Sequence, residues 1–401
     1  MLALAILILL AIACDDDPVP PPEPPAPRFV CASDAVSPLL ASKLDDDDGD
    51  GNPLDERYPA VNDEDDDIAD HCWIEDHSGT FHVFFHTESR QNPSHIDHYT
   101  TRNFQSLSYA GIALDVAPGA WDADGVWAPH VIEHDGTYYM FYTGVHGSGA
   151  EAVQRTGIAT STDLYTWVRF AINRCPGTAG NGCVYECNEP WTTFSINGEY
   201  DRQCRDPFVI WDERTQRWLL FNTSKSLNTA GVVTVAAAAN LTDWVGAGYI
   251  DATRRLSTGT AAQQSGGQCE NAFVVKAGGR YYLIFADWQD VEDDANWPNP
   301  RTMAQYATST TLEVDGSGSL NWVYRGYLPD PGVNAIEIID PRETGIPRIM
   351  SQSVASERSG VPPDSRRTLR LKCVTFSEDE KIVTEPFGLA PEAQMQILGP
   401  R

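Results

Sequence analysis

The chain has 401 residues, 42% of them hydrophobic, which is enough to bury a large core and long for one domain unless the fold is a large all-β one. Its formal net charge is −29, from 57 acidic and 28 basic residues. This acidity excludes a nucleic-acid-binding protein, because a phosphate backbone is bound by clustered Lys and Arg. The expected partner is neutral or cationic.

Residues 1–14 have the features of an export signal. The apolar run MLALAILILLAIAC is too short to span a bilayer as a helix and ends in small residues and Cys14. Its ending resembles a bacterial lipobox, in which the Cys is lipidated after cleavage, although no Lys or Arg precedes the run. We expect an extracytoplasmic bacterial lipoprotein, anchored to the membrane by lipid alone, or a secreted protein. An ordinary cleaved signal or an internal start is the alternative.

Residues 15–64 are rich in Asp and Pro and predict a disordered, acidic tether, because this composition cannot form a packed core. Within it, Asp46, Asp48 and Asp50 precede Gly51, as in the opening of a Ca²⁺-binding loop, where alternate carboxylates converge on one cation. The closing Glu of such a loop is missing. A solvated acidic linker is therefore favoured over a Ca²⁺ site.

Eight cysteines remain besides Cys14, an even number that predicts disulfides in an exported chain. Cys175, Cys183, Cys187 and Cys204 lie close together in the sequence, and we expect them to pair among themselves, with three connectivities open. The chain has no C-x2-C spacing, which argues against a zinc site.

Residues 65–401 contain a repeated hairpin, in which an apolar strand, a turn and an aromatic-rich strand follow one another. The clear copies are DHCWIEDHSGTFHVFFH from residue 70, WAPHVIEHDGTYYMFYT from 127, DPFVIWDERTQRWLLFN from 206 and ENAFVVKAGGRYYLIFA from 270. A degenerate fifth copy, AIEIIDPRETGIPRIMSQS, begins at 335. Tails such as TSTDLYTW, ending at Trp167, and ANLTDW, ending at Trp244, add further strands to each unit. The sequence therefore predicts an all-β fold, a five-bladed β-propeller.

Three of the four clear repeats begin with a carboxylate: Asp70, Asp206 and Glu270. Pro207 cannot donate to a sheet ladder, so we expect it to open a strand, with Asp206 at the mouth of that strand. Equivalent strand starts converge on one end of a propeller channel. Crowding raises at least one carboxyl pKa, which suits a general acid, while another carboxylate stays charged as base or nucleophile. Turn capping by unrelated acids is the alternative.

Several motifs resemble the five-bladed propeller glycosidases of families 32 and 43, over about residues 65–380. They are Arg205-Asp206-Pro207, Trp127-Ala128-Pro129, Glu270-x-x-Phe273 and the TSTDLYTW tails. The resemblance implies that Asp70 is the catalytic carboxylate of the first blade, that Asp206 stabilises the transition state and orients the acid, and that Glu270 is the general acid. Two departures stand out. His71 and Cys72 follow Asp70 where both families usually have Pro, so Asp66 and Asp67 remain rivals, and no Pro or Cys-Pro adjoins Glu270.

The expected function is glycoside hydrolysis of furanosides, either fructosides or arabinosides, in an oligo- or polysaccharide substrate bound by a monomer. Arg205, Trp127, Trp73 and Trp288 are candidate sugar-binding residues, because Trp faces stack on sugar rings; Arg205 could instead hold Asp206 ionised. The resemblance implies no required cofactor. In some family 43 members a His in the fifth unit helps to hold a channel cation, but GVNAIEII has no His, so a channel calcium is not implied. The stretch GAWDADGVW and the spacing from Asp70 to GTFHVFF resemble family 32, which retains configuration, whereas Trp127-Ala128-Pro129 resembles family 43, which inverts it. Retention is slightly favoured over inversion. The alternatives are a non-catalytic carbohydrate-binding propeller, or a phosphorylase or transglycosylase on the same fold.

Overall fold

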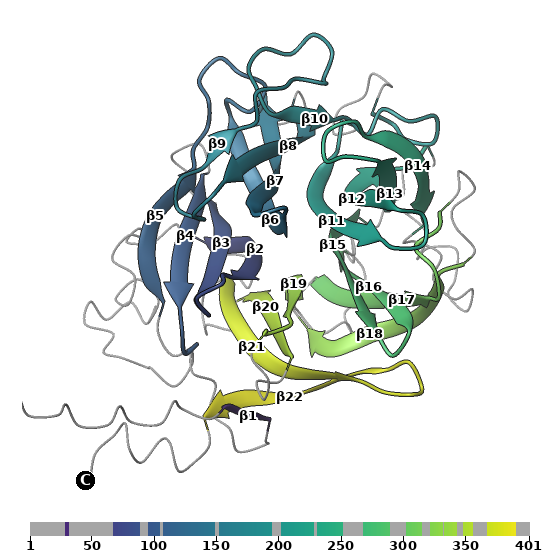
Figure 1. Cartoon of the computed structure of the whole chain (residues 1–401). Coiled ribbons are helices and arrows are strands. Elements are labelled where there is room, and N and C mark those ends of the chain that lie inside the picture. Colours follow the sequence, from purple (N-terminus) through teal and green to yellow (C-terminus); the bar gives the residue numbers. More distant parts are fainter. Residues whose placement is uncertain are drawn as a thin grey trace, which may run out of the picture.

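Five antiparallel sheets surround a central axis in the structure, a computed structural model, so the predicted five-bladed all-β propeller is confirmed (Figure 1). The structure describes residues 29–31, 67–88, 95–104, 107–148, 152–194, 202–227, 231–251, 268–288, 302–314, 321–331, 333–342, 348–355 and 367–389. These residues contain strands and no helix, and so nothing long and apolar enough to cross a bilayer as a helix.

Each blade is built from consecutive strands, with the innermost strand first in the chain. Blade 1 comprises β2 (Asp67–Glu75), β3 (Phe81–Glu88), β4 (Ile96–Thr101) and β5 (Ser108–Leu114). Blade 2 comprises β6 (Gly125–His134), β7 (Thr137–His146) and β8 (Val153–Ser161), with β9 (Val168–Arg169) and β10 (Cys183–Tyr185) both paired to β8. Blade 3 comprises β11 (Arg205–Asp212), β12 (Arg217–Lys225), β13 (Gly231–Ala238) and β14 (Val245–Ile250).

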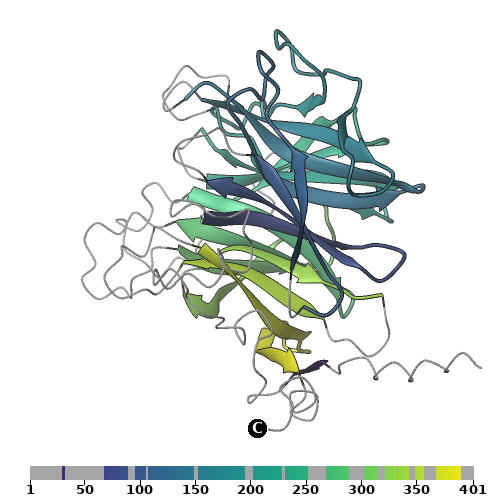
Figure 2. The same cartoon turned by 90° about the vertical axis from the view of Figure 1, so that its left-hand side faces the viewer.

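The last two blades follow the same order. Blade 4 comprises β15 (Gln268–Ala277), β16 (Arg280–Trp288), β17 (Thr302–Ser309) and β18 (Val323–Pro331). Blade 5 comprises β19 (Val333–Ile339), β20 (Ile349–Ala355), β21 (Arg367–Phe376) and β22 (Ile382–Leu389). A further strand, β1 (Phe29–Cys31), pairs with β22 and lies beside it in both views (Figures 1 and 2). This corrects the expectation of a wholly disordered tether, because three of its residues extend the sheet of blade 5.

The repeated hairpins are the two innermost strands of each blade, and the tails form a recurrent corner. In blades 2 and 3, the indole Nε1 of Trp167 donates to the Leu164 carbonyl at 2.9 Å, and that of Trp244 donates to the Leu241 carbonyl at 3.1 Å. Both rings are buried. The two tails therefore adopt the same local structure because the same contact closes them.

The core consists of separate apolar layers between neighbouring blades, and successive side chains of one strand enter different layers. Phe84 packs between blades 1 and 2, whereas Phe85 packs between blades 5 and 1. Leu220 and Phe221 divide in the same way between the two faces of blade 3. Because both faces of a blade are covered, its middle strands are continuously apolar, which explains runs such as YYMFY and YYLIF.

The expected pairing among the four neighbouring cysteines is confirmed, with disulfides Cys175–Cys183 and Cys187–Cys204. Cys373 is also disulfide-bonded. Cys72, however, is a free thiol, buried in the layer between blades 1 and 2. An even cysteine count therefore does not mean that every cysteine is bridged, since a buried thiol can also serve as a small apolar side chain.

Candidate active site

The innermost strand of blades 1 to 4 has an irregular register near one end of the channel. One non-glycine residue at each irregularity has a positive φ: Asp70 at 25°, Ala128 at 45°, Asp206 at 54° and Asn271 at 54°. Such bulges turn a side chain away from the regular alternation, and positive φ at non-glycine residues is concentrated at functional sites. The four blades thus place four equivalent residues around one end of the channel.

Asp206 lies at the bulge inside β11 rather than in front of the strand, which corrects the expectation drawn from Pro207. The proline is accommodated because the regular ladder is interrupted between Arg205 and Phe208, so no ladder hydrogen bond needs its missing N–H. The Asp206 N–H donates to the Thr143 hydroxyl of blade 2 at 2.9 Å.

Glu270 does not share the register of Asp70 and Asp206, so the prediction of three acids at one position is wrong in blade 4. The residue with positive φ there is Asn271, and Glu270 stands one residue earlier, where blade 3 has Arg205. An amide therefore occupies the position expected for an acid. Sequence reasoning missed Asn271, and alignment of the bulges rather than of the acids would have indicated it.

Asn271 connects the two aspartates. Its backbone N–H donates to Asp206 Oδ2 at 3.0 Å, and its side-chain Nδ2 donates to Asp70 Oδ1 at 2.7 Å. Of the three candidates in the first blade, Asp70 is therefore the one that the structure joins to the site. Asp66 and the side chain of Asp67 lie outside the described residues.

Arg205 connects the acids of blades 3 and 4. Its Nη2 donates to Glu270 Oε1 at 2.9 Å, and its Nε lies 3.5 Å from Asp206 Oδ2. Its Nη1 donates to Gln203 Oε1 at 2.6 Å. The guanidinium is buried. Of the two roles considered for Arg205, its contacts favour holding carboxylates over binding sugar hydroxyls.

The pKa of Asp206 is raised from 3.8 to about 7, first because burial removes water from its carboxylate. The charges of Asp70 and Glu270 raise the pKa further, while Arg205 and the Asn271 N–H act in the opposite direction. The expected rise of a carboxyl pKa by neighbouring acids is thus present at Asp206, the residue to which the resemblance assigns stabilisation of the transition state. Near neutral pH Asp206 can therefore hold a proton, and a carboxyl that is protonated at this pH is one of the groups that acid–base chemistry requires.

His86, on β3, adds a group that sequence reasoning did not identify. Its Nδ1 accepts a hydrogen bond from the Ala128 N–H at 3.2 Å and lies 3.8 Å from Asp70 Oδ2. Its ring stacks beside the half-buried ring of Trp127, with centroids 6.2 Å apart. His86 therefore links the acid of blade 1 to the bulge of blade 2.

The other predicted sugar-binding residues have different outcomes. Trp73 is only 6% exposed, packs on Phe104 and donates from Nε1 to the Ser351 hydroxyl, so its assignment to the sugar site is wrong. Because side chains alternate between the two faces of a strand, Trp73 points into the apolar layer between blades 5 and 1. The side chain of Trp288 lies outside the described residues, as do Cys14 and the candidate calcium ligands Asp46, Asp48 and Asp50.

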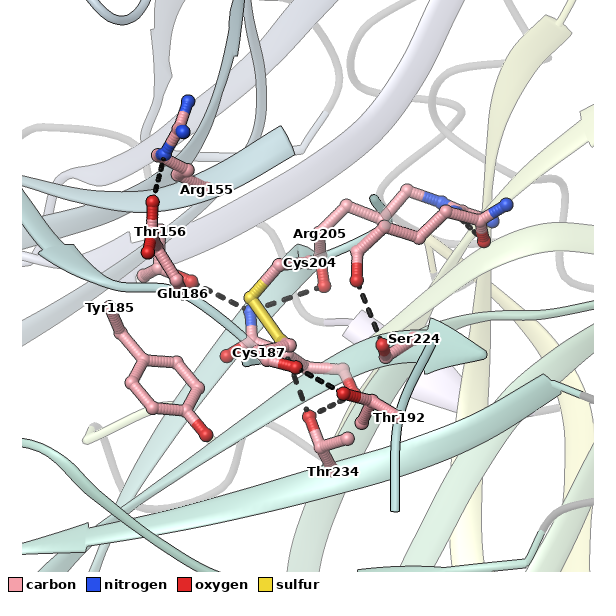
Figure 3. The surroundings of a disulfide bond; sticks show 12 residues. Arg155, Thr156, Tyr185, Glu186, Cys187, Thr192, Cys204, Arg205, Ser224 and Thr234 are labelled. Atoms are coloured by element: carbon pink, nitrogen blue, oxygen red, sulfur yellow. Dashed lines mark hydrogen bonds and ion pairs between the residues drawn. A yellow bond between two sulfur atoms is a disulfide. The ribbon is translucent and has the colours of Figure 1, made fainter. Parts of the chain in front are cut away.

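The Cys187–Cys204 disulfide directly precedes Arg205 and fixes the entry into β11 (Figure 3). The adjoining backbone is held by two further bonds: Ser224 Oγ donates to the Gln203 carbonyl at 2.8 Å, and Asn222 Nδ2 donates to the Arg205 carbonyl at 3.2 Å. The disulfide and these bonds restrict the backbone that carries both Arg205 and Asp206.

A small cavity of about 40 Å³ lies in the channel beside these groups. Six polar residues are among those that line it: Asp70, His71, His130, Asp206, Asn271 and Glu337. Its volume admits one or a few waters. Within the described residues, two of these lining residues, His130 and Glu337, form with Cys72 a group with the chemistry to hold a metal ion.

Comparison with known proteins agrees with this geometry. Residues 67–316 match the family described as glycosyl hydrolases family 43. No curated protein sequence matches the chain. Among solved structures, an exo-1,5-α-L-arabinanase from a bovine ruminal metagenomic library is similar, with TM-score 0.51 and 16% identity, covering 80% of this chain and 98% of that one.

Two further structures show the same fold. An endo-arabinase from Bacteroides thetaiotaomicron has TM-score 0.55 and 14% identity, covering 78% of this chain and 95% of that one. A family 32 β-fructofuranosidase from Bombyx mori has TM-score 0.59 and 15% identity, covering 87% of this chain and 70% of that one.

Proposed function

The chain belongs to glycosyl hydrolases family 43 and is a glycosidase, and we propose that it hydrolyses furanosides, with arabinosides ahead of fructosides. Arabinosides are supported by two of the similar structures, which are named as an exo-1,5-α-L-arabinanase and an endo-arabinase, while a third is named as a β-fructofuranosidase. Both groups of names refer to enzymes of five-membered sugar rings.

The observation that carries this proposal is the connection of three carboxylates at one end of the channel. Asn271 joins Asp70 to Asp206, and Arg205 joins Asp206 to Glu270. Glycoside hydrolysis needs two carboxyl groups on opposite sides of the scissile bond, one to protonate the leaving oxygen and one to activate or replace water. The chain supplies both, and a third acid beside them.

We assign Glu270 as the general acid and Asp70 as its partner. Arg205 and Asn271 fix the directions of these two carboxyl groups, and Asp206 orients Glu270 through the shared guanidinium. Because the family match is to family 43, which the sequence resemblance associates with inversion, we propose that Asp70 acts as a general base on water. This reverses the slight preference for retention drawn from the sequence. The protons come from protein side chains, so the reaction calls for no cofactor.

The cellular setting completes the proposal. An export signal, lipidation at Cys14 and an acidic tether would place the enzyme outside the cytoplasm, where oligo- and polysaccharides are encountered. The charge of −29 is compatible with a neutral glycan as substrate.

The test is hydrolysis of matched aryl α-L-arabinofuranosides, aryl β-D-fructofuranosides and aryl pyranosides by the purified chain, with Glu270→Gln as control. We expect furanoside hydrolysis that this substitution abolishes for substrates with poor leaving groups. NMR of the first product distinguishes inversion from retention. Hydrolysis of pyranosides alone would refute the substrate assignment, and sugar binding without hydrolysis would favour a carbohydrate-binding propeller.

A further inference from the structure

A second cluster of titratable side chains lies on the inner strands, two to three residues after the irregularity in the register of each strand. The proposed hydrolysis does not use it. It consists of Cys72 on β2, His130 on β6 and Glu337 on β19, which belong to blades 1, 2 and 5. All three are buried, with exposed fractions of 1%, 8% and 6%. One potential ligand atom from each lies within 4.8 Å of the others. Buried groups of this kind are found together when they share a proton or a metal ion.

Hydrogen bonds fix which atom of His130 faces the cluster. Its Nε2 lies 3.2 Å from the Val209 carbonyl, which can only accept, so Nε2 carries the proton. The Nδ1 of the neutral ring therefore presents a lone pair, and it lies 4.0 Å from Glu337 Oε1. A backbone carbonyl is one of the usual outer partners of the far nitrogen of a metal-binding imidazole.

The other two residues are oriented in a comparable way. The Trp73 N–H donates to Glu337 Oε2, which leaves Oε1 as the oxygen that faces His130. The Val131 N–H donates to Cys72 Sγ at 3.1 Å. Each ligand thus has one backbone contact that holds it in place and one atom directed to the common centre.

The separation of the two acceptor atoms favours a cation over a proton. At 4.0 Å, Glu337 Oε1 and His130 Nδ1 are too far apart for a hydrogen bond, even with a protonated carboxyl. Two ligands at about 2.1 Å from a tetrahedral zinc ion are about 3.4 Å apart, so a small closing movement suffices. The mixture of thiol, imidazole and carboxylate selects zinc or a similar borderline cation and disfavours Ca²⁺ and Mg²⁺, which prefer oxygen ligands.

His71 provides an independent observation at the same place. Its ring is more than nine-tenths buried, and neither nitrogen has a hydrogen bond of ordinary geometry, the Ser351 backbone offering only a poorer one. It lines the same cavity as His130 and Glu337. The cavity has room for a water between such an imidazole and an ion.

We propose that Cys72, His130 and Glu337 bind one zinc ion, with His71 reaching the ion through a water in the shared cavity. The ion would join the last blade to the first two, at the point where the two ends of the propeller meet. Its role is structural: none of the three ligands is among the carboxylates assigned to hydrolysis, although His130 and Glu337 line the same cavity as Asp70 and Asp206. The site uses no C-x2-C motif, which is why the cysteine spacing argued against zinc.

The test uses the full chain, stripped with a chelator and titrated with Zn²⁺ or Co²⁺. We expect about one zinc per chain and, with zinc at about 100 times its Kd, a rise in Tm of about 4 °C for a domain of this size. Co²⁺ should produce a near-ultraviolet thiolate-to-cobalt absorption band. Cys72→Ser should abolish the band, and Glu337→Gln should weaken zinc binding at least tenfold. His134→Gln, on the same strand but 43% exposed, should change neither.

Two results would overturn the proposal. One is Co²⁺ binding to the unsubstituted chain without a thiolate band, which would place the ion on surface or tether groups. The other is a Tm that rises with Ca²⁺ but not with Zn²⁺. Both measurements use the unsubstituted chain, so they decide the matter even if a variant fails to fold.

Discussion

Replacing Asp206 with Asn should make the protein more stable and less active. The carboxylate is buried and its pKa is raised from 3.8 to about 7. A shift of about 3 units corresponds to about 4 kcal/mol by which folding disfavours the ionised form. The Asn side chain keeps the shape and can accept the hydrogen bond from the Asn271 N–H. The gain in unfolding free energy at pH 8 is therefore at most about 4 kcal/mol, or about 6 °C in Tm for a domain of this size.

The sign of the pH dependence follows from proton binding. Between pH 4 and 7 the folded chain keeps a proton on Asp206 that the unfolded chain has released, so the stability of the unsubstituted protein falls as the pH rises through this window. Asp206→Asn cannot titrate there and lacks this fall. The difference between the two proteins should be near zero at pH 4 and should reach its full size above pH 7.

Urea unfolding at pH 4, 6 and 8 measures this difference, and kcat/KM is measured in parallel. Asp212→Asn serves as a control, because Asp212 is buried on the same strand but accepts bonds from Arg214 and Thr215 at a turn away from the site. If Asp206→Asn were no more stable than the unsubstituted protein at pH 8, or if its gain were the same at pH 4, the account of Asp206 as a destabilising buried acid would be refuted.

Three further outcomes are expected. Glu270→Gln should lower kcat at least about 100-fold on substrates with poor leaving groups while Tm is kept, because an amide cannot donate the proton; full activity on such substrates would remove Glu270 from that role. Asn271→Gly should lower kcat about tenfold or more with little change in KM, because Asp70 loses the hydrogen bond from Asn271 Nδ2, while glycine tolerates the positive φ. A fall in kcat below threefold would argue against Asn271 as the residue that positions Asp70. A chain shortened to begin at residue 65 should keep its kcat/KM but lose stability, because β1 no longer pairs with β22, and loss of activity in the folded protein would contradict the prediction.

The fold could be predicted because its evidence is local and repeated. Each inner hairpin carries its own apolar strands and turn, and the blades cover one another, so the same pattern recurs five times along the chain. The Arg205-Asp206-Pro207 motif likewise marked one corner of the site from adjacent residues alone. Such signals need no knowledge of distant contacts.

The details of the site depended on tertiary structure. The bulges decided that Asn271, not Glu270, occupies the register of Asp70, because a single extra residue in a strand changes where the side chains after it point. The core position of Trp73 followed from which faces the blades present to one another. The folded chain also decided which of the three disulfide connectivities forms.

The sequence by itself determined the architecture, the family resemblance and the candidate acids, since these are expressed in neighbouring residues. Only the folded chain decided the pKa of Asp206 and the meeting of Cys72, His130 and Glu337 from three blades. Desolvation and ligand geometry depend on residues far away in the chain, and no spacing pattern encodes which of them close around a given atom.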